Sequence, residues 1–342
     1  MMNSIGEKWF AVVNPHAGSG KAGLEWERVE KLLRAHGIDC ITSGTGCSRH
    51  ATEIACRAAE GGYRRFLAAG GDGTVHEVLC GIAGAIGNAS LRGESMSLRE
   101  FTLAVMPIGS GNDWIRSHGI RHDPDEVIRL LEKESFALQD IAKVTVLEPS
   151  GKVSGTLIPG PYSYMVNIGG AGLDARVCER VNWQKSRGGK GRMLYVKSLI
   201  YNLIHRRVSD VRIECDGKVA YEGKCMSVAF GIGRYSGGGL RQTPDAVTDD
   251  GLLDYTVVPP VSLADIFRVG PRLFNGTFTR SGIIISGRCR SLTVFPLDGD
   301  GDIVEVDGEI IGTLPVKVEI LPSQINVLHD YGSTHSARID ID

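Results

Sequence analysis

The sequence predicts two domains of different class: an α/β domain with a mostly parallel sheet, then an antiparallel β-sandwich domain. The chain has 342 residues, and a globular domain typically takes about 150. Apolar strand-like runs alternate with amphipathic helical runs as far as residue 138, which is typical of a parallel sheet covered by helices. Beyond it, short strand-like runs separated by turn residues dominate. We therefore expect domains over 1–138 and 139–330, and a C-terminal tail over 331–342.

Each element of the first domain follows from its own pattern. Short apolar runs predict strands at 9–13, 40–42, 65–69 and 103–107. Apolar residues at helical spacing predict helices at 22–36, 50–59, 75–82 and 124–134. The last of these helices opens with Asp123-Pro124, an N-cap residue followed by a first-turn proline. Because segment 84–100 is rich in Gly, Ser and charge, we expect a surface loop there.

The second domain is expected to be mainly strands. The candidates are 141–147, 162–168, 210–215, 225–232, 252–258, 291–296, 303–307, 316–321 and 325–328. One long helix, over about 190–205, interrupts them.

Composition excludes several classes of protein. Apolar residues make up 42% and charged residues 23%, with a net charge of -2, so nothing global favours a nucleic-acid partner. We find no signal peptide and no apolar run near the ~18 residues of a membrane span. The eight cysteines are scattered without a C-x-x-C pair, which favours reduced thiols over disulfides or a zinc site. We therefore expect a cytoplasmic protein.

Residues 70–74 read Gly-Gly-Asp-Gly-Thr between a predicted strand and a predicted helix. Glycines let backbone N–H groups approach a ligand closely, and a helix N-terminus favours a phosphate. A purely structural turn is the alternative. Glu77 falls one turn into the same helix, whereas His76 is expected to be a surface or packing residue.

Two further glycine-rich loops follow predicted strands. Residues 14–21 read Asn-Pro-His-Ala-Gly-Ser-Gly-Lys, which is not a Walker A motif, and residues 107–113 read Pro-Ile-Gly-Ser-Gly-Asn-Asp. The carboxyl ends of parallel strands lie on one edge of the sheet, where ligands bind. We therefore expect the three loops to converge there, with Asn14 holding its loop and Lys21 reaching a phosphate.

Two turns of the second domain carry acidic residues. After Gly237-Gly238-Gly239, the run 244–254 contains four Asp, a pattern that suits either a hard cation or a surface turn. Residues 306–309 read Val-Asp-Gly-Glu, which by itself indicates an ordinary hairpin turn.

Together these motifs resemble the diacylglycerol kinase catalytic family, most closely its soluble bacterial lipid kinases. They are also similar to sphingosine kinases and, more distantly, to NAD kinases. The most specific matches are the segments 70–74, 109–113 and 237–254. The resemblance implies a nucleotide-binding α/β domain of the NAD kinase and phosphofructokinase kind, a β-sandwich domain, and an active site in the cleft between them.

The resemblance also implies roles for individual residues. The implied ATP-contacting residues are Asn14, Gly18, Gly20, Lys21, Thr45, Gly71, Asp72, Gly73, Thr74, Glu77, Ser110 and Asn112. Asp250 matches a metal-binding residue, thought to hold a structural ion, with the carbonyls of Val247 and Leu252 as co-ligands. Glu309 matches the proton acceptor, with Asp307 beside it, and Asp72 would organise the nucleotide and a catalytic Mg²⁺. Ser110 stands where Thr is commoner, which keeps the hydroxyl, and Trp114 replaces a frequent Phe or Leu.

The expected function is ATP- and Mg²⁺-dependent phosphorylation of a hydroxyl of diacylglycerol or a related lipid. Two alternatives stay open: a kinase for a soluble acceptor such as NAD, and a non-catalytic nucleotide- or lipid-binding protein. A membrane-derived substrate implies transient contact with a membrane surface, for which the basic segment 183–207 is the candidate. The alternative that we favour for that segment is packing on the sandwich, through a stripe of Met193, Val196, Ile200, Leu203 and Ile204. A homodimer is left open.

Overall fold

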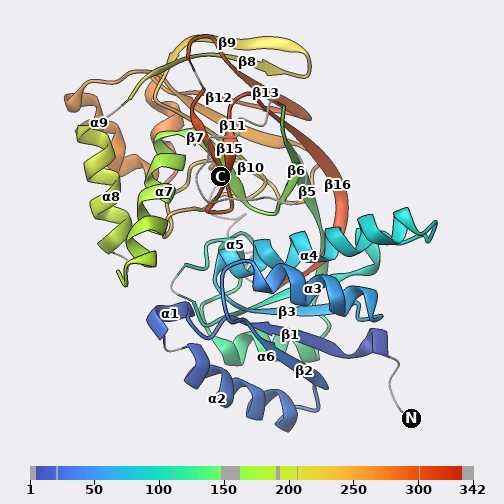
Figure 1. Cartoon of the computed structure of the whole chain (residues 1–342). Coiled ribbons are helices and arrows are strands. Elements are labelled where there is room, and N and C mark those ends of the chain that lie inside the picture. Colours follow the sequence, from blue (N-terminus) through green and yellow to red (C-terminus); the bar gives the residue numbers. More distant parts are fainter. Residues whose placement is uncertain are drawn as a thin grey trace. The chain divides into compact units, whose positions relative to one another are not determined.

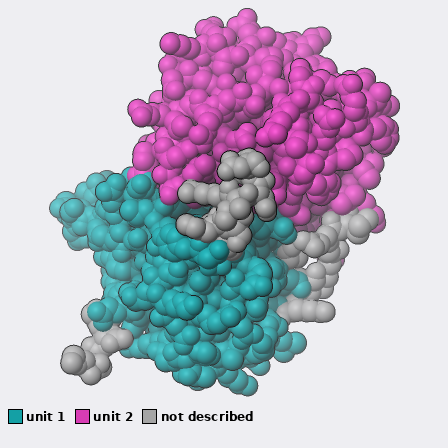
Figure 2. Space-filling view, turned by 180° about the vertical axis from the view of Figure 1, so that it is seen from behind, with its two compact units in different colours: residues 1–139, 323–342 teal, residues 140–322 magenta. Residues whose placement is uncertain are grey.

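The computed structural model describes residues 5–20, 22–109, 111–147, 162–189, 193–205, 207–299 and 301–332. Contacts divide the chain into two compact units, coloured separately in Figure 2. Unit 1 comprises residues 1–139 and 323–342, and unit 2 comprises residues 140–322. The first division falls within one residue of the sequence boundary. The chain then returns to unit 1 at Ser323, whereas the sequence assigned everything up to residue 330 to the second domain.

Unit 1 is built on a parallel sheet (Figure 1). Its strands run in the order β2-β1-β3-β4, with bounds Cys40–Gly44, Trp9–Val13, Arg65–Gly70 and Thr102–Pro107. The end of the long strand β16 (Val316–Leu328) adds to β4 in parallel, with Asn326 opposite Thr102, which explains the return of the chain. The helical elements are η1 (Ile5–Glu7), α1 (Ala17–Gly20), α2 (Ala22–Ala35), α3 (His50–Glu60), α4 (Asp72–Leu91), η2 (Leu98–Glu100), α5 (Trp114–Ser117) and α6 (Pro124–Glu132).

Helix α4 is much longer than expected, because it continues through residues 84–91, which the sequence assigned to a loop. Earlier in the same helix, Gly81 is required for packing. A Cβ on Gly81 would collide with the carbonyl of Thr52 and the side chain of Ala55 on α3, so glycine allows the two helices to approach closely. Ala85 and Ala89 are fully buried on the same helix. The burial of this small-residue face outweighs the low helix propensity of glycine.

Unit 2 contains two groups of strands with a shared apolar core. One antiparallel sheet has the order β12-β11-β10-β7-β14-β15, with bounds Ile285–Cys289, Leu253–Val258, Ser227–Gly231, Ile168–Gly172, Ile303–Val306 and Glu309–Thr313. Opposite it, the first part of β16 pairs with β13 (Ser291–Pro296), which pairs with β8 (Ser209–Cys215), which pairs with β9 (Lys218–Cys225). Strand β5 (Phe136–Val146) pairs with β16 and with β6 (Tyr162–Met165). Phe230 of the first group and Ile213 and Val294 of the second are fully buried in the common core.

The fold class expected from the sequence is therefore confirmed. Several elements of unit 2 were missed: β9, β12, β15, helices α7 (Leu173–Ser186) and α9 (Leu263–Val269), and the short helices η3 (Gly270–Leu273) and η4 (Thr277–Ser281). The expected strand 162–168 is two strands, and the two expected after residue 316 are the single strand β16.

Helix α8 (Met193–Ile204) is present, but the expectation that its apolar stripe packs on the sandwich is wrong for Val196, Ile200 and Ile204, which are exposed. In the part of the chain that the structure describes, no helix has both the length and the apolar character required to cross a membrane.

Candidate functional site

The carboxyl edge of the unit 1 sheet gathers the glycine-rich loops, as expected. The loop after β3 and the loop after β4 are joined by two backbone hydrogen bonds, from Gly109 N–H to Gly70 O (3.0 Å) and from Asp72 N–H to Gly111 O (3.2 Å). A Cβ on Gly71 would lie 2.6 Å from Gly111 O, and one on Gly109 would lie 2.7 Å from Gly71 N. These two glycines are therefore required for the loops to pack on one another, whatever ligand they also meet.

The loop after β1 joins the same cluster. The N–H of Asn14 donates to Ala69 O at the end of β3 (2.9 Å), and the Asn14 side-chain oxygen accepts the N–H of His16 (3.1 Å). Gly18 has a left-handed backbone (φ 57°), and a Cβ there would lie 2.6 Å from Ile108 O. Thr45, after β2, donates its N–H to Val13 O (2.8 Å) and is buried. Loops after four strands thus meet at one edge.

Asp72 connects the two central loops through its side chain. One carboxylate oxygen accepts the N–H of Asp113 (2.9 Å) and the other accepts the N–H of Trp114 (3.1 Å). These groups begin helix α5, whose own N-cap residue makes no side-chain capping bond. Asp72 therefore acts as a cap supplied from 41 residues earlier in the chain. Its expected contact with the nucleotide stays a prediction.

Glu77 also binds backbone. Its two carboxylate oxygens accept the N–H groups of Arg49 and Ala51, each at 3.1 Å, at the start of α3. Arg49 has a left-handed backbone and no side-chain cap of its own. Glu77 thus fixes the start of α3 against α4 and, through Arg49, holds the end of the loop that contains Thr45. His76 is buried, as a packing residue should be.

Some polar groups at this edge have no partner among the residues that the structure describes. Among the residues described, none accepts the N–H of Gly73, in the first turn of α4. The side-chain oxygen of Asn112 is buried with no hydrogen-bond donor, while its amide donates to Gly109 O (2.9 Å). Gly20 (φ 87°) has open space where a side chain would be. A helix N–H without an acceptor among the described residues and an open loop suit an anion such as phosphate. Lys21 and Ser110 lie outside the described residues.

The buried side chain of Gln139 supports helix α5 through hydrogen bonds. The Trp114 indole and the His118 ring both donate to the side-chain oxygen of Gln139, at 2.9 and 2.7 Å. Burial lowers the pKa of His118 to about 3, and neighbouring His329 acts in the same direction, so the ring is neutral near pH 7. Trp114, which departs from the family pattern, is thus held by a specific hydrogen bond.

The second candidate region lies in unit 2, in the hairpin between β14 and β15. Asp307 and Gly308 both have positive φ (50° and 89°), and Val306 pairs with Glu309, which identifies a two-residue type I′ turn. The Asp307 carboxylate accepts the N–H groups of Val166 and Asn167, each at 3.0 Å, and is buried. Asp307 therefore holds the hairpin against the β6–β7 turn.

Glu309 differs from Asp307 in being half-buried and without a hydrogen bond or ion pair to any residue that the structure describes. Its backbone is fixed by the hairpin and by helix α7, whose Asn182 donates to Gly308 O (3.1 Å). A rigidly mounted carboxylate with free lone pairs is what a proton acceptor requires.

Asn167 is a candidate that the sequence did not reveal. It lies in the β6–β7 turn, and its amide donates to Tyr235 O (2.9 Å). Its side-chain oxygen is buried and has no donor among the residues that the structure describes. An unpaired buried acceptor costs roughly 1–3 kcal/mol, so a bound ligand that donates to it gains that amount. In the sequence, the only feature that sets Asn167 apart is its position directly after a strand, and many asparagines without a role in binding have such a position.

The acidic turn before β11 is neutralised by an arginine. One oxygen of Asp250 accepts the N–H of Leu252 (3.1 Å), and the other forms an ion pair with Arg288, whose Nε also donates to Asp254 (2.9 Å). Burial raises the pKa of Asp254 to about 6, while Arg288 opposes that shift. Asp140 fixes the turn by accepting the N–H of Gly251 (2.6 Å).

Where the resemblance implies a metal ion beside Asp250, the structure has an arginine. In the described ranges, no three His, Cys, Asp or Glu side chains are grouped to hold a metal ion. The carboxylate of Asp250 already binds a guanidinium, which supplies the positive charge of a structural cation. Asp250, Val247 and Leu252 stay the metal ligands that the resemblance predicts, whereas the ion pair with Arg288 favours a turn that is stable without a metal. No step below depends on a metal here.

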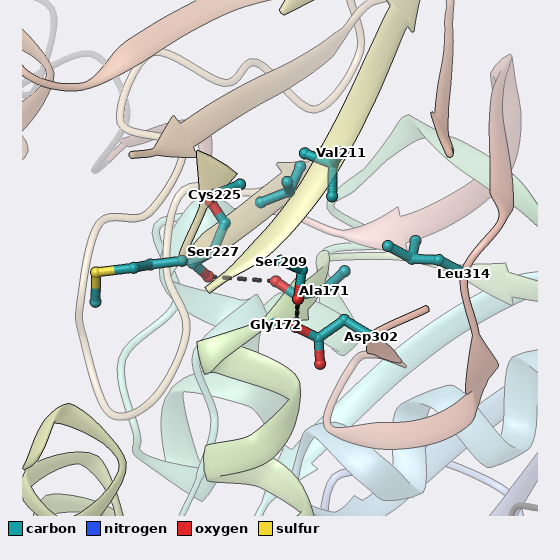
Figure 3. A pocket seen from close by; sticks show the side chains of 10 residues that line it. Ala171, Gly172, Ser209, Val211, Cys225, Ser227, Asp302 and Leu314 are labelled. Carbon is teal, nitrogen blue, oxygen red and sulfur yellow. Dashed lines mark hydrogen bonds between the residues drawn. The ribbon is translucent and has the colours of Figure 1, made fainter. Parts of the chain in front are cut away.

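A further polar cluster surrounds the start of α7. Asp302 forms an ion pair with Arg176 (2.7 Å) and accepts from Ser209 (2.9 Å), while Asp174 accepts from Ser227 (2.5 Å) and Gln242 (2.7 Å). Burial raises the pKa of Asp174. Figure 3 shows a small cavity lined in part by Ser209, Ser227 and Asp302 of this cluster, which measures about 10 Å³ and has room for at most one water. The cluster is therefore structural support.

Known proteins match both regions. Residues 8–144 match the diacylglycerol kinase catalytic domain, and residues 167–329 match the YegS C-terminal NAD kinase beta sandwich-like domain. The chain is 25% identical over 322 residues to a diacylglycerol kinase of Mycobacterium tuberculosis, covering 94% of both chains. It is 26% identical over 317 residues to a diacylglycerol kinase of Bacillus subtilis, covering 93% of this chain and 94% of that one.

A solved structure agrees in fold. The crystal structure of a diacylglycerol kinase from Bacillus anthracis has a TM-score of 0.66 and 22% identity, covering 97% of this chain and 100% of that one. The first family model thus matches mainly unit 1 and the second mainly unit 2, in the same order as the motifs in the sequence. The chain belongs to the diacylglycerol kinase catalytic family.

Proposed function

We propose that this protein is a lipid kinase, which transfers the γ-phosphoryl group of ATP to a hydroxyl of diacylglycerol or a related lipid. The observation that carries the proposal is the convergence of the loops after β1, β2, β3 and β4 at one edge of the parallel sheet. The names of the related proteins support the choice of a lipid acceptor.

The nucleotide side of the reaction would use unit 1. The N–H of Gly73 and the open loop at Gly20 would face the phosphates, and the partial positive charge of the α4 N-terminus would offset their charge. Asp72 would contribute by locking the two central loops together, since phosphoryl transfer depends chiefly on positioning. Mg²⁺ bound to ATP would neutralise further charge, with no ligand assigned from this chain.

The acceptor side would use unit 2. The hydroxyl oxygen of the lipid attacks the γ-phosphorus, the bond from that phosphorus to the bridging oxygen breaks, and ADP leaves. Glu309 takes the proton of the hydroxyl, since no residue in the described ranges occupies its carboxylate. Asp307 positions Glu309 through the hairpin and is not itself the acceptor, because backbone N–H groups occupy both of its oxygens.

The test is a panel of acceptors incubated with labelled ATP and the full chain, with products separated by chromatography. The panel contains diacylglycerol, monoacylglycerol, a sphingoid base, ceramide, a polyprenol and NAD. We expect label in one or more lipids and none in NAD. Label in NAD alone would replace the proposal with a soluble-acceptor kinase, and no consumption of ATP with any acceptor would favour a non-catalytic binding protein.

A further inference from the structure

Two helices of unit 2 present rows of large apolar side chains to solvent. On α8, Val196, Ile200 and Ile204 are 44%, 52% and 68% exposed. On α9, Leu263 and Phe267 are 56% and 80% exposed, and Phe274 just after η3 is 65% exposed. A spacing of four residues places each row on one face of its helix. Single exposed apolar residues are ordinary, whereas grouped ones mark an interaction surface. We call these six residues the docking face.

The two rows belong to neighbouring parts of unit 2. The ring of Tyr195 on α8 packs against Gly237, where a Cβ would collide with it. A few residues further along the same loop, Arg241 donates its N–H to Leu273 O of η3 (2.8 Å), and Pro244 lies against Gly276. Figure 1 accordingly shows α8 and α9 next to each other, on the same side of unit 2.

The sequence segments that carry the docking face are rich in positive charge. Residues 183–208 contain seven Lys or Arg and no Asp or Glu, although the whole chain has a net charge of -2. Residues 263–283 contain three Arg and one Asp, and this Asp265 is in an ion pair with Arg268 (2.9 Å). On α7, the Arg187 guanidinium lies over the ring of Trp183, which is itself half exposed. Aliphatic and aromatic side chains among basic residues complement an anionic bilayer surface.

We propose that the docking face inserts into the surface of an anionic membrane, from which the protein draws its acceptor. The inference rests on the proposed function, because a diacylglycerol-like substrate resides in the bilayer. The apolar rows enter the region between head groups and acyl chains, while the flanking Lys and Arg side chains meet lipid phosphates.

The first test is co-sedimentation of the full chain with vesicles of phosphatidylglycerol and phosphatidylcholine, or of phosphatidylcholine alone. We expect binding to the anionic vesicles only. The double variant Ile200→Ser/Phe267→Ser should lose roughly ten- to hundredfold in partitioning, because two apolar side chains no longer leave water. The variant Lys197→Glu/Arg272→Glu should lose binding as well. Leu91→Ser is the matched control, since Leu91 of α4 is 89% exposed, and it should bind like the unaltered protein.

The second test separates docking from catalysis. With diacylglycerol in anionic vesicles, Ile200→Ser/Phe267→Ser should lose activity in proportion to its binding. With a short-chain diacylglycerol dissolved as monomers, it should keep normal activity. If no lipid is phosphorylated but the vesicle results hold, docking stands and the proposed function fails.

Three outcomes would overturn the docking proposal. The first is equal binding of the docking variant and the unaltered protein, and the second is no binding of the unaltered protein to anionic vesicles. The third is a dimer that Ile200→Ser/Phe267→Ser converts to a monomer without any vesicle binding, which would show that a second copy of the chain covers the face.

Discussion

The strongest structural prediction concerns Asp72, which the sequence presents as a catalytic group and the structure shows as a cap. Asp72→Asn keeps the shape of the side chain, but an amide has one acceptor oxygen where the carboxylate has two. One of the two N–H groups, of Asp113 or Trp114, would then face an NH₂ donor inside the protein. Losing one charge-assisted hydrogen bond and weakening the other costs about 2–4 kcal/mol.

The assay is thermal unfolding of the full chain without ligand. A loss of that size should lower Tm by roughly 4–16 °C, at ~2–4 °C per kcal/mol for a unit of this size. The matched control is Asp123→Asn, because Asp123 caps α6 through a single N–H, that of Asp125, and Asn and Asp are equally good N-caps. If Asp72→Asn and Asp123→Asn both melt like the unaltered protein, the capping role of Asp72 is refuted.

Three other predictions follow from the same contacts. As pH falls below about 6.5, the unfolded chain protonates His118 while the folded chain keeps it neutral down to about pH 3, so the free energy of unfolding falls by up to about 1.4 kcal/mol per pH unit. In denaturant unfolding, the difference in stability between the unaltered protein and His118→Asn should therefore shrink from pH 7 to pH 5. A constant difference would contradict this. Because Arg288 is paired with Asp250 and Asp254, EDTA and Mg²⁺ should leave Tm unchanged, whereas Arg288→Gln should lower the free energy of unfolding by about 1–2 kcal/mol. A fall of Tm in EDTA would instead support a metal ion bound at this turn. Asn167→Ala should lower kcat/KM for the lipid about tenfold with an unchanged KM for ATP, as expected for one lost hydrogen bond to the acceptor, and equal kinetics would remove Asn167 from the site.

The positions of the loops were predictable because strand direction determines them. Once 9–13, 65–69 and 103–107 are read as parallel strands, the segments after them must share an edge, and the structure joins Gly70 to Gly109 there. The two-domain organisation and the I′ hairpin at Asp307-Gly308 follow from equally local patterns. Such features depend on strand order and backbone conformation, which short motifs encode well.

The partners of the carboxylates were not predictable. Asp72, Glu77 and Asp307 look alike in a motif, yet each binds backbone N–H groups between 26 and 141 residues away along the chain. Glu309 has the same chemistry without such a partner, and only the fold distinguishes it. The prediction that the apolar stripe of α8 packs on the sandwich was wrong for a related reason. Apolar residues at helical spacing form the same sequence pattern whether they pack on a core or face solvent.

The central claim is that Glu309 takes the proton of a lipid hydroxyl during phosphoryl transfer from ATP. The most direct measurement compares the unaltered protein with Glu309→Gln in lipid-dependent ATP turnover, using the acceptor found in the panel. We predict a loss of kcat of about 10²-fold or more with an unchanged Tm, because Glu309 has no structural partner in the described chain and a general base contributes roughly 10²–10⁴-fold. Full turnover by a folded Glu309→Gln variant would contradict the account.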